Sequence, residues 1–255
     1  MTKPVVLVTG GGSGIGAGIV ARLAAAGWQV VSAGRRAAAL EAGAGKREGE
    51  RDADAISGVV CDITDQGSVD ALLETVTERF GRLDALVNNA GQTVLGLYAD
   101  SDILDLVRLI EVNLVGTMRI THRAIPLLAR QGGSILNIGS TLADRCQPGT
   151  AAYAASKGAI ESLTRALAVE LGPSSNIRVN CIRPSVVRSE IMTSAGMAEE
   201  VYETLIEDRG AGYPLGRAGD PADIAHMAEF LLSDRAGWVT GSIVDVDGGY
   251  AAAGH

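Results

Sequence analysis

The chain has 255 residues, of which 47% are apolar and 20% are charged, ordinary values for a globular protein with a full core. This composition excludes a disordered chain, and three cysteines are too few for a disulfide scaffold of this length. The net charge is −8, and the sequence has no basic tract that would neutralise a phosphate backbone. We therefore expect no nucleic-acid partner.

The amino-terminal residues do not have the pattern of a signal peptide. The apolar run before Thr9 has only four residues, and no stretch approaches the roughly 18 residues of a membrane helix. The three cysteines suit a reducing compartment. The sequence therefore predicts a cytoplasmic protein with no membrane partner.

Short β-branched runs alternate with longer segments of helical period along the whole chain. The runs predict strands at residues 5–8, 29–32, 58–60, 83–87, 134–138, 177–182 and 243–246. Between them, helical spacing of apolar residues predicts buried faces made of Ile15, Ile19 and Leu23; of Val69, Leu72, Leu73, Val76 and Phe80; of Ile103, Leu106, Val107, Ile110 and Leu114; and of Ile160, Leu163, Leu167 and Leu171. This alternation predicts one α/β domain over residues 1–255, a doubly wound parallel sheet with helices on both faces.

Two segments interrupt the alternation. Residues 37–55 mix small and charged residues, which predicts a solvated helix and loop. Residues 188–220 form a connection that is long for a compact domain, and such connections are usually functional or disordered. Because this segment carries Ile191, Met192, Met197, Val201 and Leu205, we expect a partly helical lid over a substrate site.

A glycine-rich loop follows the first predicted strand and opens the first predicted helix. Glycines let the backbone turn tightly and approach a pyrophosphate, and a helix amino terminus supplies free N–H groups to the phosphates. A phosphate-loop NTPase is the competing interpretation, but the loop lacks the Lys-Ser/Thr pair that such sites need. We therefore expect a dinucleotide to bind at Gly10, Ser13, Gly14, Ile15 and Gly16.

The end of the second predicted strand bears on the choice of cofactor. A carboxylate there would bind the adenosine ribose hydroxyls and repel a 2′-phosphate. This chain has Gly34 at the expected position, followed by Arg35 and Arg36, whose guanidinium groups can bind phosphate oxygens. The sequence thus favours NADP(H) over NAD(H); the alternative is that the two arginines only cap a surface turn.

Tyr153 and Lys157 lie four residues apart, which places both side chains on one face of a helix. A nearby cation favours the phenolate form, so it lowers a tyrosine pKa from its ordinary value near 10. Alone, this spacing is common on solvated helices, and the pair gains meaning only with other motifs.

These motifs together resemble the short-chain dehydrogenase/reductase family in its compact form. The resemblance extends from Pro4 to Gly249 and rests on Thr9–Gly16, on Asn88-Asn89-Ala90-Gly91, and on Asn113, Ser140, Tyr153 and Lys157 in family-like order and spacing. It implies a Rossmann-like sheet of seven strands and an enzyme that moves hydride between nicotinamide and a substrate carbon.

The resemblance also implies catalytic roles. Tyr153 is similar to the general acid of carbonyl reduction and the base of the reverse reaction. Lys157 would lower the pKa of Tyr153 and hold the nicotinamide ribose, and Ser140 would orient the substrate carbonyl. Asn113 resembles the asparagine that holds a water in a proton relay. Ser140 and Tyr153 are therefore the expected substrate contacts.

Further cofactor contacts follow from the same resemblance. Asp62 would contact adenine with Ile63 beside it, and Asn89 and Ala90 would flank the adenine ribose. Asn88 is expected to brace the sheet instead. On the nicotinamide side, the expected contacts are Pro184, Val187 and Ser189, besides Tyr153 and Lys157. The chain departs from the family pattern at Ser185, where the family usually has glycine, and we expect this residue to restrict the backbone there.

The sequence therefore predicts an NADP(H)-preferring oxidoreductase that interconverts a ketone or aldehyde and an alcohol, with NAD(H) possible. The alternatives are a 3-oxoacyl carrier-protein reductase, with Arg123, Arg130 and Arg165 as a basic surface, an NAD-dependent sugar or polyol dehydrogenase, and a non-catalytic NADP(H) sensor. The family resemblance implies a homo-oligomer, a dimer or tetramer. No metal site is expected, because His122, His226 and His255 lack ligand spacing.

Overall fold

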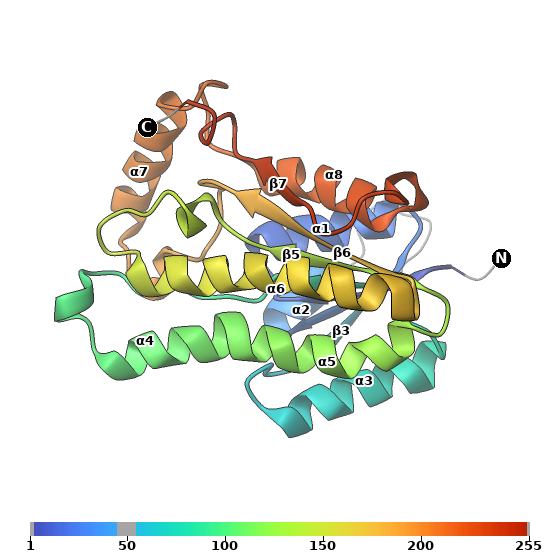
Figure 1. Cartoon of the computed structure of the whole chain (residues 1–255). Helices are drawn as coiled ribbons and strands as arrows, with labels where there is room; N and C mark the ends of the chain where they lie inside the picture. Colours follow the sequence, from blue (N-terminus) through green and yellow to red (C-terminus); the bar gives the residue numbers. More distant parts are fainter. Residues whose placement is uncertain (1–2, 45–54, 254–255) are drawn as a thin grey trace.

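Seven parallel strands form one sheet in a computed structural model that describes residues 3–44 and 55–253 (Figure 1). The strands are β1 (Val5–Thr9), β2 (Gln29–Gly34), β3 (Ile56–Val60), β4 (Ala85–Asn88), β5 (Gly133–Ile138), β6 (Ile177–Pro184) and β7 (Ile243–Val246). Their order is β3-β2-β1-β4-β5-β6-β7, and every neighbouring pair is parallel. The predicted seven-stranded, Rossmann-like parallel sheet is confirmed.

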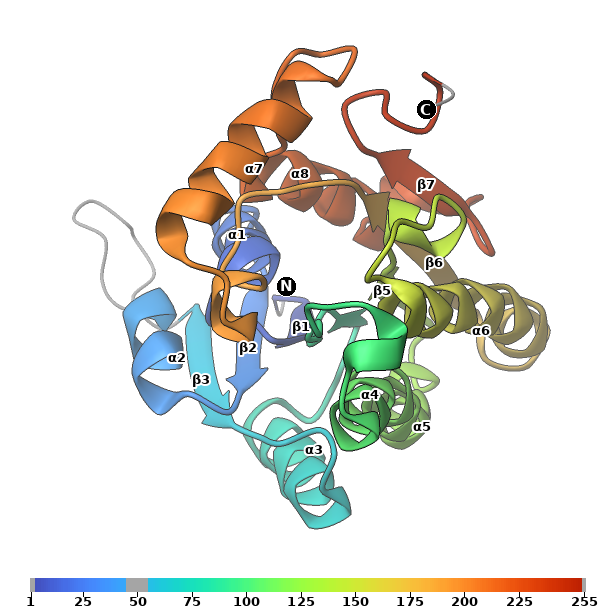
Figure 2. The same cartoon turned by 90° about the vertical axis from the view of Figure 1, so that its left-hand side faces the viewer.

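Helices cover both faces of this sheet (Figure 2). One face carries α1 (Gly14–Ala25), α2 (Ala37–Ala44) and α8 (Pro221–Leu232), and the other carries α3 (Gln66–Phe80), α4 (Ile103–Ile110), α5 (Thr117–Leu128) and α6 (Ala151–Ser175). A π-helical turn, η2 (Glu111–Gly116), joins α4 to α5, and α7 (Glu199–Ala211) lies within the predicted lid segment. Short 3-10 turns are η1 (Tyr98–Asp100), η3 (Thr141–Ala143), η4 (Thr193–Ala195) and η5 (Asp234–Ala236). The predicted helix of 37–55 is α2, and residues 45–54 of that prediction lie outside the described residues.

The central strand shows why both faces are apolar. Side chains alternate along a strand, so Val5 and Leu7 of β1 enter one core cluster while Val6 and Val8 enter the other. The first cluster packs against α3, α5 and α6, and the second against α1 and α8. A strand buried on both sides therefore reads as a continuous apolar run.

Helix α3 matches its predicted face. Val69, Leu72, Leu73 and Val76 are all buried, and the Asp65 side chain caps the helix by accepting a hydrogen bond from the Ser68 backbone N–H at 2.7 Å. At its other end, Gly81 adopts a φ of +66°, which ends the helix.

The predicted face of α4 is partly wrong. Leu106 is buried, but Ile103 and Val107 are 61% and 51% exposed, and the buried side also includes Leu109. The apolar stripe of this helix is wider than the surface that the sheet covers, and the π-helical turn shifts the register after Ile110. The helix therefore leaves apolar side chains on its outer side.

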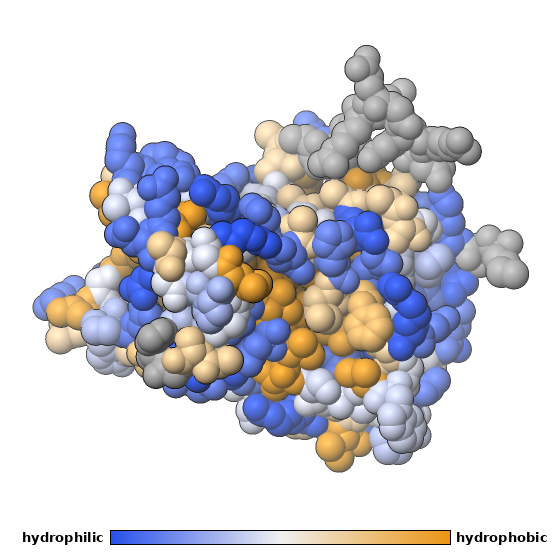
Figure 3. Space-filling model, turned by 90° about the horizontal axis from the view of Figure 1, so that it is seen from above, coloured by the Kyte–Doolittle hydropathy of each residue, from blue (hydrophilic) through white to orange (hydrophobic). Residues whose placement is uncertain are grey.

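A second apolar surface lies on the opposite side of the molecule. Figure 3 shows apolar side chains gathered between polar margins on the face that α8 and the end of the chain help to form. Phe230 of α8 and Trp238, after η5, are exposed, and Trp238 is fully so. Within the described residues, no helix has the length and apolar character needed to cross a bilayer.

The order in which strands are added to the sheet reverses between β1 and β4. From β1 the next strands are added toward the β3 edge, and from β4 onward they are added toward the β7 edge. In open parallel sheets, ligands bind beyond the carboxyl ends of the strands at such a switch point. Figure 2 looks onto this edge, where the loops after β1, β4 and β5 come together with α7 above them.

Candidate active site

A cleft of about 740 Å³ opens at this edge of the sheet. The loops that follow β1 to β6 line it, together with part of α7 and the end of the chain. Of the predicted site residues, only Gly16 and Asn113 lie outside its lining. One cleft thus brings together residues that lie more than two hundred positions apart in the sequence.

The glycine loop can accept a pyrophosphate only because its glycines carry no side chains. Gly10 has a φ of +65°, which a side chain would disfavour. A Cβ on Gly16 would lie 2.1 Å from the Gly10 carbonyl oxygen, so only glycine lets the helix start this close to the loop. Gly16 thus shapes the cradle from below without lining the cleft. These features fit a dinucleotide whose phosphates lie against the first turn of α1.

Asn89 and Thr9 brace the loop from behind. The Asn89 Nδ2 donates to the carbonyl oxygens of Thr9 and Gly10, both at 3.0 Å. The Thr9 hydroxyl accepts from the backbone N–H groups of Asn89 and Ala90 at 3.1 Å. Asn88 instead bonds Thr121 and Asn137, as expected for a residue that braces the sheet. The loops after β1 and β4 therefore form one rigid floor.

Charged residues gather at the end of the cleft beyond β2 and β3. Arg36 donates to the Ser13 hydroxyl and to Glu190, each at 2.9 Å. Arg35 is exposed in the cleft, and its side chain makes no hydrogen bond or ion pair with another described residue. Burial opposes ionisation of Asp62, but hydrogen bonds from Thr64 and the nearby Arg35 hold its pKa below the ordinary value. This end offers a free guanidinium to an anion.

At the other end of the cleft, Ser140, Tyr153 and Lys157 lie together. Ser140 lies two residues beyond β5, rather than ending the strand, and its Oγ accepts from the Leu142 N–H at 3.2 Å. Tyr153 and Lys157 follow on α6, and the Lys157 Nζ lies 5.6 Å from the Tyr153 ring centroid. Lys157 is buried and donates to the Ile138 carbonyl oxygen at 2.8 Å. Residues from two elements therefore present hydroxyl groups and a cation to one point.

The protein alone shifts the pKa of this tyrosine upward. Desolvation by burial raises the pKa of Tyr153 to about 12, against a smaller lowering by its hydrogen bond with Ser140. Burial also lowers the pKa of Lys157 to about 8. Burial sets the direction of the Tyr153 shift, and the expected lowering of this pKa by Lys157 stays a prediction. At neutral pH the phenol is protonated, the form that a general acid needs.

Asn113 lies behind the cleft, in the π-helical turn. Its Oδ1 accepts from the Gln92 N–H at 2.8 Å, and its Nδ2 donates to the Gln92 carbonyl at 2.9 Å and to the Ser156 hydroxyl at 3.2 Å. The side chain therefore ties the loop after β4 to the helix that carries Tyr153. Its role as a water-holding residue stays a prediction.

Two tyrosine hydroxyls tie the 188–220 segment to the loop after β6. Tyr202 of α7 accepts from the Ser189 N–H at 2.8 Å, and the Tyr213 hydroxyl lies 2.8 Å from the Ser185 Oγ. Tyr213 also accepts from the Val186 N–H at 3.2 Å. Ser185 does not adopt a positive φ, because Asn176 is the only described non-glycine residue that does, and the expected restriction of the backbone at Ser185 stays a prediction. Ser185 instead gives the tyrosine a partner.

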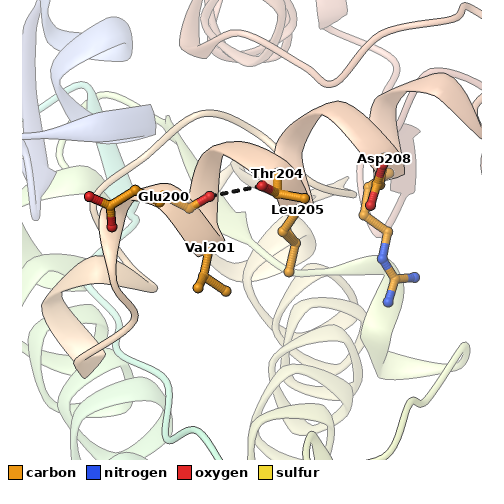
Figure 4. Close-up of a pocket in the computed structure, with 6 residues that line it drawn as sticks. Glu200, Val201, Thr204, Leu205 and Asp208 are labelled. Atoms are coloured by element: carbon orange, nitrogen blue, oxygen red, sulfur yellow. Dashed lines mark hydrogen bonds between the residues drawn. The ribbon is translucent and has the colours of Figure 1, made fainter.

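One exposed side of α7 lines a groove beside the cleft. Figure 4 shows Val201 and Leu205 pointing the same way from this helix, one turn apart, and Leu205 lines the cleft itself. The Thr204 hydroxyl donates to the Glu200 carbonyl at 2.9 Å. The expected helical part of the segment is present, while its action as a lid stays a prediction.

Several lining residues had no signal in the sequence. Tyr202, Tyr213 and Tyr250 belong to segments without a recognisable motif, and the Tyr213 and Tyr250 rings meet at a centroid distance of 5.4 Å. Glu190 and Arg209 were likewise not singled out. Only contacts between distant segments place these side chains in the cleft.

Known proteins resemble this chain over nearly its whole length. A family model described as enoyl-(acyl carrier protein) reductase matches residues 10–251. The chain is 36% identical to an L-fucose dehydrogenase of Bos taurus, over 96% of this chain and 88% of the relative. It is 33% identical to a 3-oxoacyl-[acyl-carrier-protein] reductase of Thermotoga maritima, over 96% of both chains. A solved 3-ketoacyl-(acyl-carrier-protein) reductase from Brucella melitensis, complexed with NADH, has a TM-score of 0.85 at 35% identity, covering 96% of this chain and 97% of that one.

The relatives are dehydrogenases and reductases that act on alcohol and carbonyl groups, and they match nearly the whole length of this chain. The sequence motifs, the all-parallel sheet and the glycine-lined cleft agree with the match. This chain belongs to the short-chain dehydrogenase/reductase family and is an oxidoreductase that uses a nicotinamide cofactor to interconvert carbonyl and alcohol groups.

Proposed function

We propose that this chain is an NADP(H)-preferring reductase and dehydrogenase in which Tyr153 transfers the proton between enzyme and substrate. The observation that supports this most is the meeting of Ser140, Tyr153 and Lys157 at one end of the glycine-lined cleft. A protein that only bound the cofactor would not need the two hydroxyl groups, which argues against the sensor alternative.

In the direction of reduction, each residue has a distinct task. The Ser140 hydroxyl donates a hydrogen bond to the carbonyl oxygen of the substrate, which orients it beside Tyr153. The Tyr153 hydroxyl donates its proton to that oxygen as the alkoxide forms, and the raised pKa keeps the proton in place until then. In the reverse direction the phenolate accepts the proton of the alcohol.

The cofactor, when bound, supplies or accepts the hydride. Gly10, Ser13, Gly14 and Ile15 would hold its pyrophosphate, and Gly16 allows the close approach of α1. The adenosine would lie among Arg35, Arg36, Asp62, Ile63, Asn89 and Ala90, and the nicotinamide riboside among Tyr153, Lys157, Pro184, Val187 and Ser189.

The preference for NADP(H) is supported by the charge at the adenosine end. Arg35 is exposed there and forms no salt bridge with any carboxylate that the structure describes, and no acidic residue follows β2 directly. A guanidinium group binds phosphate oxygens in a planar, two-pronged geometry. Arg36, by contrast, already contacts Glu190, so Arg35 is the residue free to take the 2′-phosphate.

Replacing Arg35 with aspartate is expected to raise KM for NADPH about tenfold to a hundredfold and to spare or lower KM for NADH, because a carboxylate repels the 2′-phosphate and accepts ribose hydroxyls. Steady-state kinetics with both cofactors measures this. Arg79→Asp, an exposed arginine in the last turn of α3, makes the same charge reversal away from the cleft. An unchanged preference in Arg35→Asp refutes the assignment of Arg35.

The reaction class is tested by oxidation of NADPH and of NADH, side by side, over a panel of ketones, aldehydes and a 3-oxoacyl thioester. We expect turnover of at least one carbonyl compound, faster with NADPH. Faster turnover with NADH contradicts the cofactor preference and leaves the reaction intact. Tight cofactor binding without turnover of any compound contradicts the proposed reaction and favours the alternative of a non-catalytic sensor.

The carrier-protein alternative gains no support from its predicted basic surface. Arg123 pairs with Asp70 at 2.5 Å, and Arg165 lies 3.6 Å from Glu161, so two of the three arginines already face carboxylates. The sugar or polyol alternative, with NAD, differs in its cofactor and is resolved by the same assay.

The chain is further proposed to act in the cytoplasm as a homo-oligomer. The exposed apolar side chains of α4 and the apolar face beside α8 are two separate surfaces that a second and a third copy would cover, which suits a tetramer or, if one surface is used, a dimer.

A further inference from the structure

The α7 side of the cleft has one charged side chain that catalysis does not use. Six charged residues line the whole cleft: Arg35, Arg36, Asp62, Lys157, Glu190 and Arg209. The first three and Glu190 surround the adenosine end, where Glu190 contacts Arg36. Lys157 is bonded to the Ile138 carbonyl beside Tyr153. Arg209 remains, at a distance in the sequence from every motif of the family.

Arg209 lies in the last turn of α7, four residues after Leu205, so both lie on the side of the helix that lines the cleft. It is exposed, and its side chain makes no ion pair or hydrogen bond with any other residue that the structure describes. Glu200 and Asp208 line the adjoining groove on α7 (Figure 4), but neither is paired with Arg209 within the described chain. Its five N–H donors are therefore available to a ligand.

Arg209 lies four residues before Tyr213, whose hydroxyl lies 2.8 Å from the Ser185 Oγ in the loop after β6. The cleft lining also includes many apolar and aromatic side chains, among them Leu95, Leu142, Met192, Met197 and Tyr213. Such walls favour an apolar segment of substrate, and an isolated guanidinium beside them fixes the position of an anion.

We infer that Arg209 binds an anionic group of the substrate, and that the substrate is a carbonyl compound or alcohol whose reacting carbon is separated from an acid group, such as a carboxylate, by an apolar segment. This inference rests on the proposed function and names its substrate class. Arg209 acts as a specificity residue: it holds the acid group while Ser140 and Tyr153 contact the reacting oxygen.

The test compares straight-chain keto acids of increasing length, each with its methyl ester, which has nearly the same shape and no charge. For the wild-type enzyme we expect kcat/KM for the best keto acid to exceed that for its ester by about tenfold to a hundredfold, the usual value of a charge-assisted bond. The ratio is expected to fall as ionic strength rises. A ratio near one for every chain length overturns the inference.

Arg209→Gln is expected to bring this ratio close to one by raising KM for the acid, and Arg209→Lys to keep part of it. Arg188→Gln makes the same substitution in the same segment, at an exposed arginine that pairs with Glu203 and does not line the cleft, and should keep the wild-type ratio. Equal ratios in Arg209→Gln and Arg188→Gln overturn the inference.

The two proposals fail in different ways. If neither acids nor esters are turned over while the cofactor binds, the proposed function fails and this inference fails with it. If esters are reduced as fast as acids, and Arg209→Gln has the same acid-to-ester ratio of kcat/KM as the wild type, the proposed function stands and the role of Arg209 is wrong.

Discussion

Replacing Tyr153 with phenylalanine is expected to lower kcat by about a hundredfold to ten-thousandfold, the range that a positioned general acid contributes. The ring, its packing and the burial of the site are retained, and only the proton donor is lost. Affinity for the cofactor should change by no more than about twofold, because Lys157 and the glycine loop remain. Steady-state turnover and titration of cofactor fluorescence measure the two effects.

Tyr98→Phe is the matched control. It removes the same hydroxyl from an exposed tyrosine of η1, which does not line the cleft. Near-normal turnover in Tyr153→Phe would exclude Tyr153 as the proton donor, whereas loss of cofactor binding in that variant would indicate a structural role.

Replacing Lys157 with methionine is expected to abolish most turnover and, at pH 7, to raise the free energy of unfolding by about 1–3 kcal/mol. Burial holds the pKa of Lys157 at about 8 in the folded chain, against an ordinary value of 10.5, so the folded state carries a poorly solvated charge. Methionine fills similar space without that charge, although the Ile138 carbonyl loses its hydrogen bond. Lys157, which we propose to be catalytic, is therefore expected to cost stability, as functional residues often do.

The sign of the pH dependence makes this prediction specific. Between pH 8 and 10.5 the unfolded chain still binds a proton that the folded chain has released, so wild-type stability rises with pH across this window. The gain in free energy of unfolding of Lys157→Met over the wild type should therefore be largest below pH 8 and should decrease above pH 8. The raised pKa of Tyr153 acts in the opposite direction above pH 10, but it is present in both proteins.

Chemical denaturation at several pH values from 7 to 10 measures the difference. Lys3→Met removes a lysine from an exposed position outside the cleft and should show no such shrinking difference. A Lys157→Met variant that is less stable than the wild type by the same amount at every pH would show that the lysine stabilises the fold instead.

The alternation of apolar runs placed every strand of the sheet, with errors of one or two residues at the ends. The β-branched residues of 177–182, for example, predict β6, which continues to Pro184. Local patterns suffice here because strands covered on both faces must be apolar throughout. The glycine loop and the Tyr153–Lys157 pair were equally local, since each depends on spacing within one turn or one helix.

What could not be predicted depends on contacts between distant segments. The sequence around Asn113 does not predict the π-helical turn that directs the Asn113 side chain toward Gln92. The partners of Ser185 and Ser189 lie 28 and 13 residues further along the chain. The upward pKa shift of Tyr153 arises from its surroundings, which the spacing to Lys157 does not describe. Spacing in the sequence predicts which groups react, whereas the packing around those groups sets their protonation.

The end of the chain closes one side of the cleft. Residues after β7 fold back so that the Leu215 N–H donates to the Gly248 carbonyl at 3.1 Å, the Gln147 side chain donates to the Tyr250 hydroxyl at 3.2 Å, and Arg145 donates to the Ala251 carbonyl. These contacts join the segment before Tyr153 to the one after α7, yet none of these terminal residues belongs to a strand. A few exchanges near the carboxyl terminus can therefore remodel the substrate chamber while the nucleotide half keeps its architecture. Divergence of substrate range within such enzymes needs no change in the hydride-transfer chemistry, because the two are built from different parts of the chain.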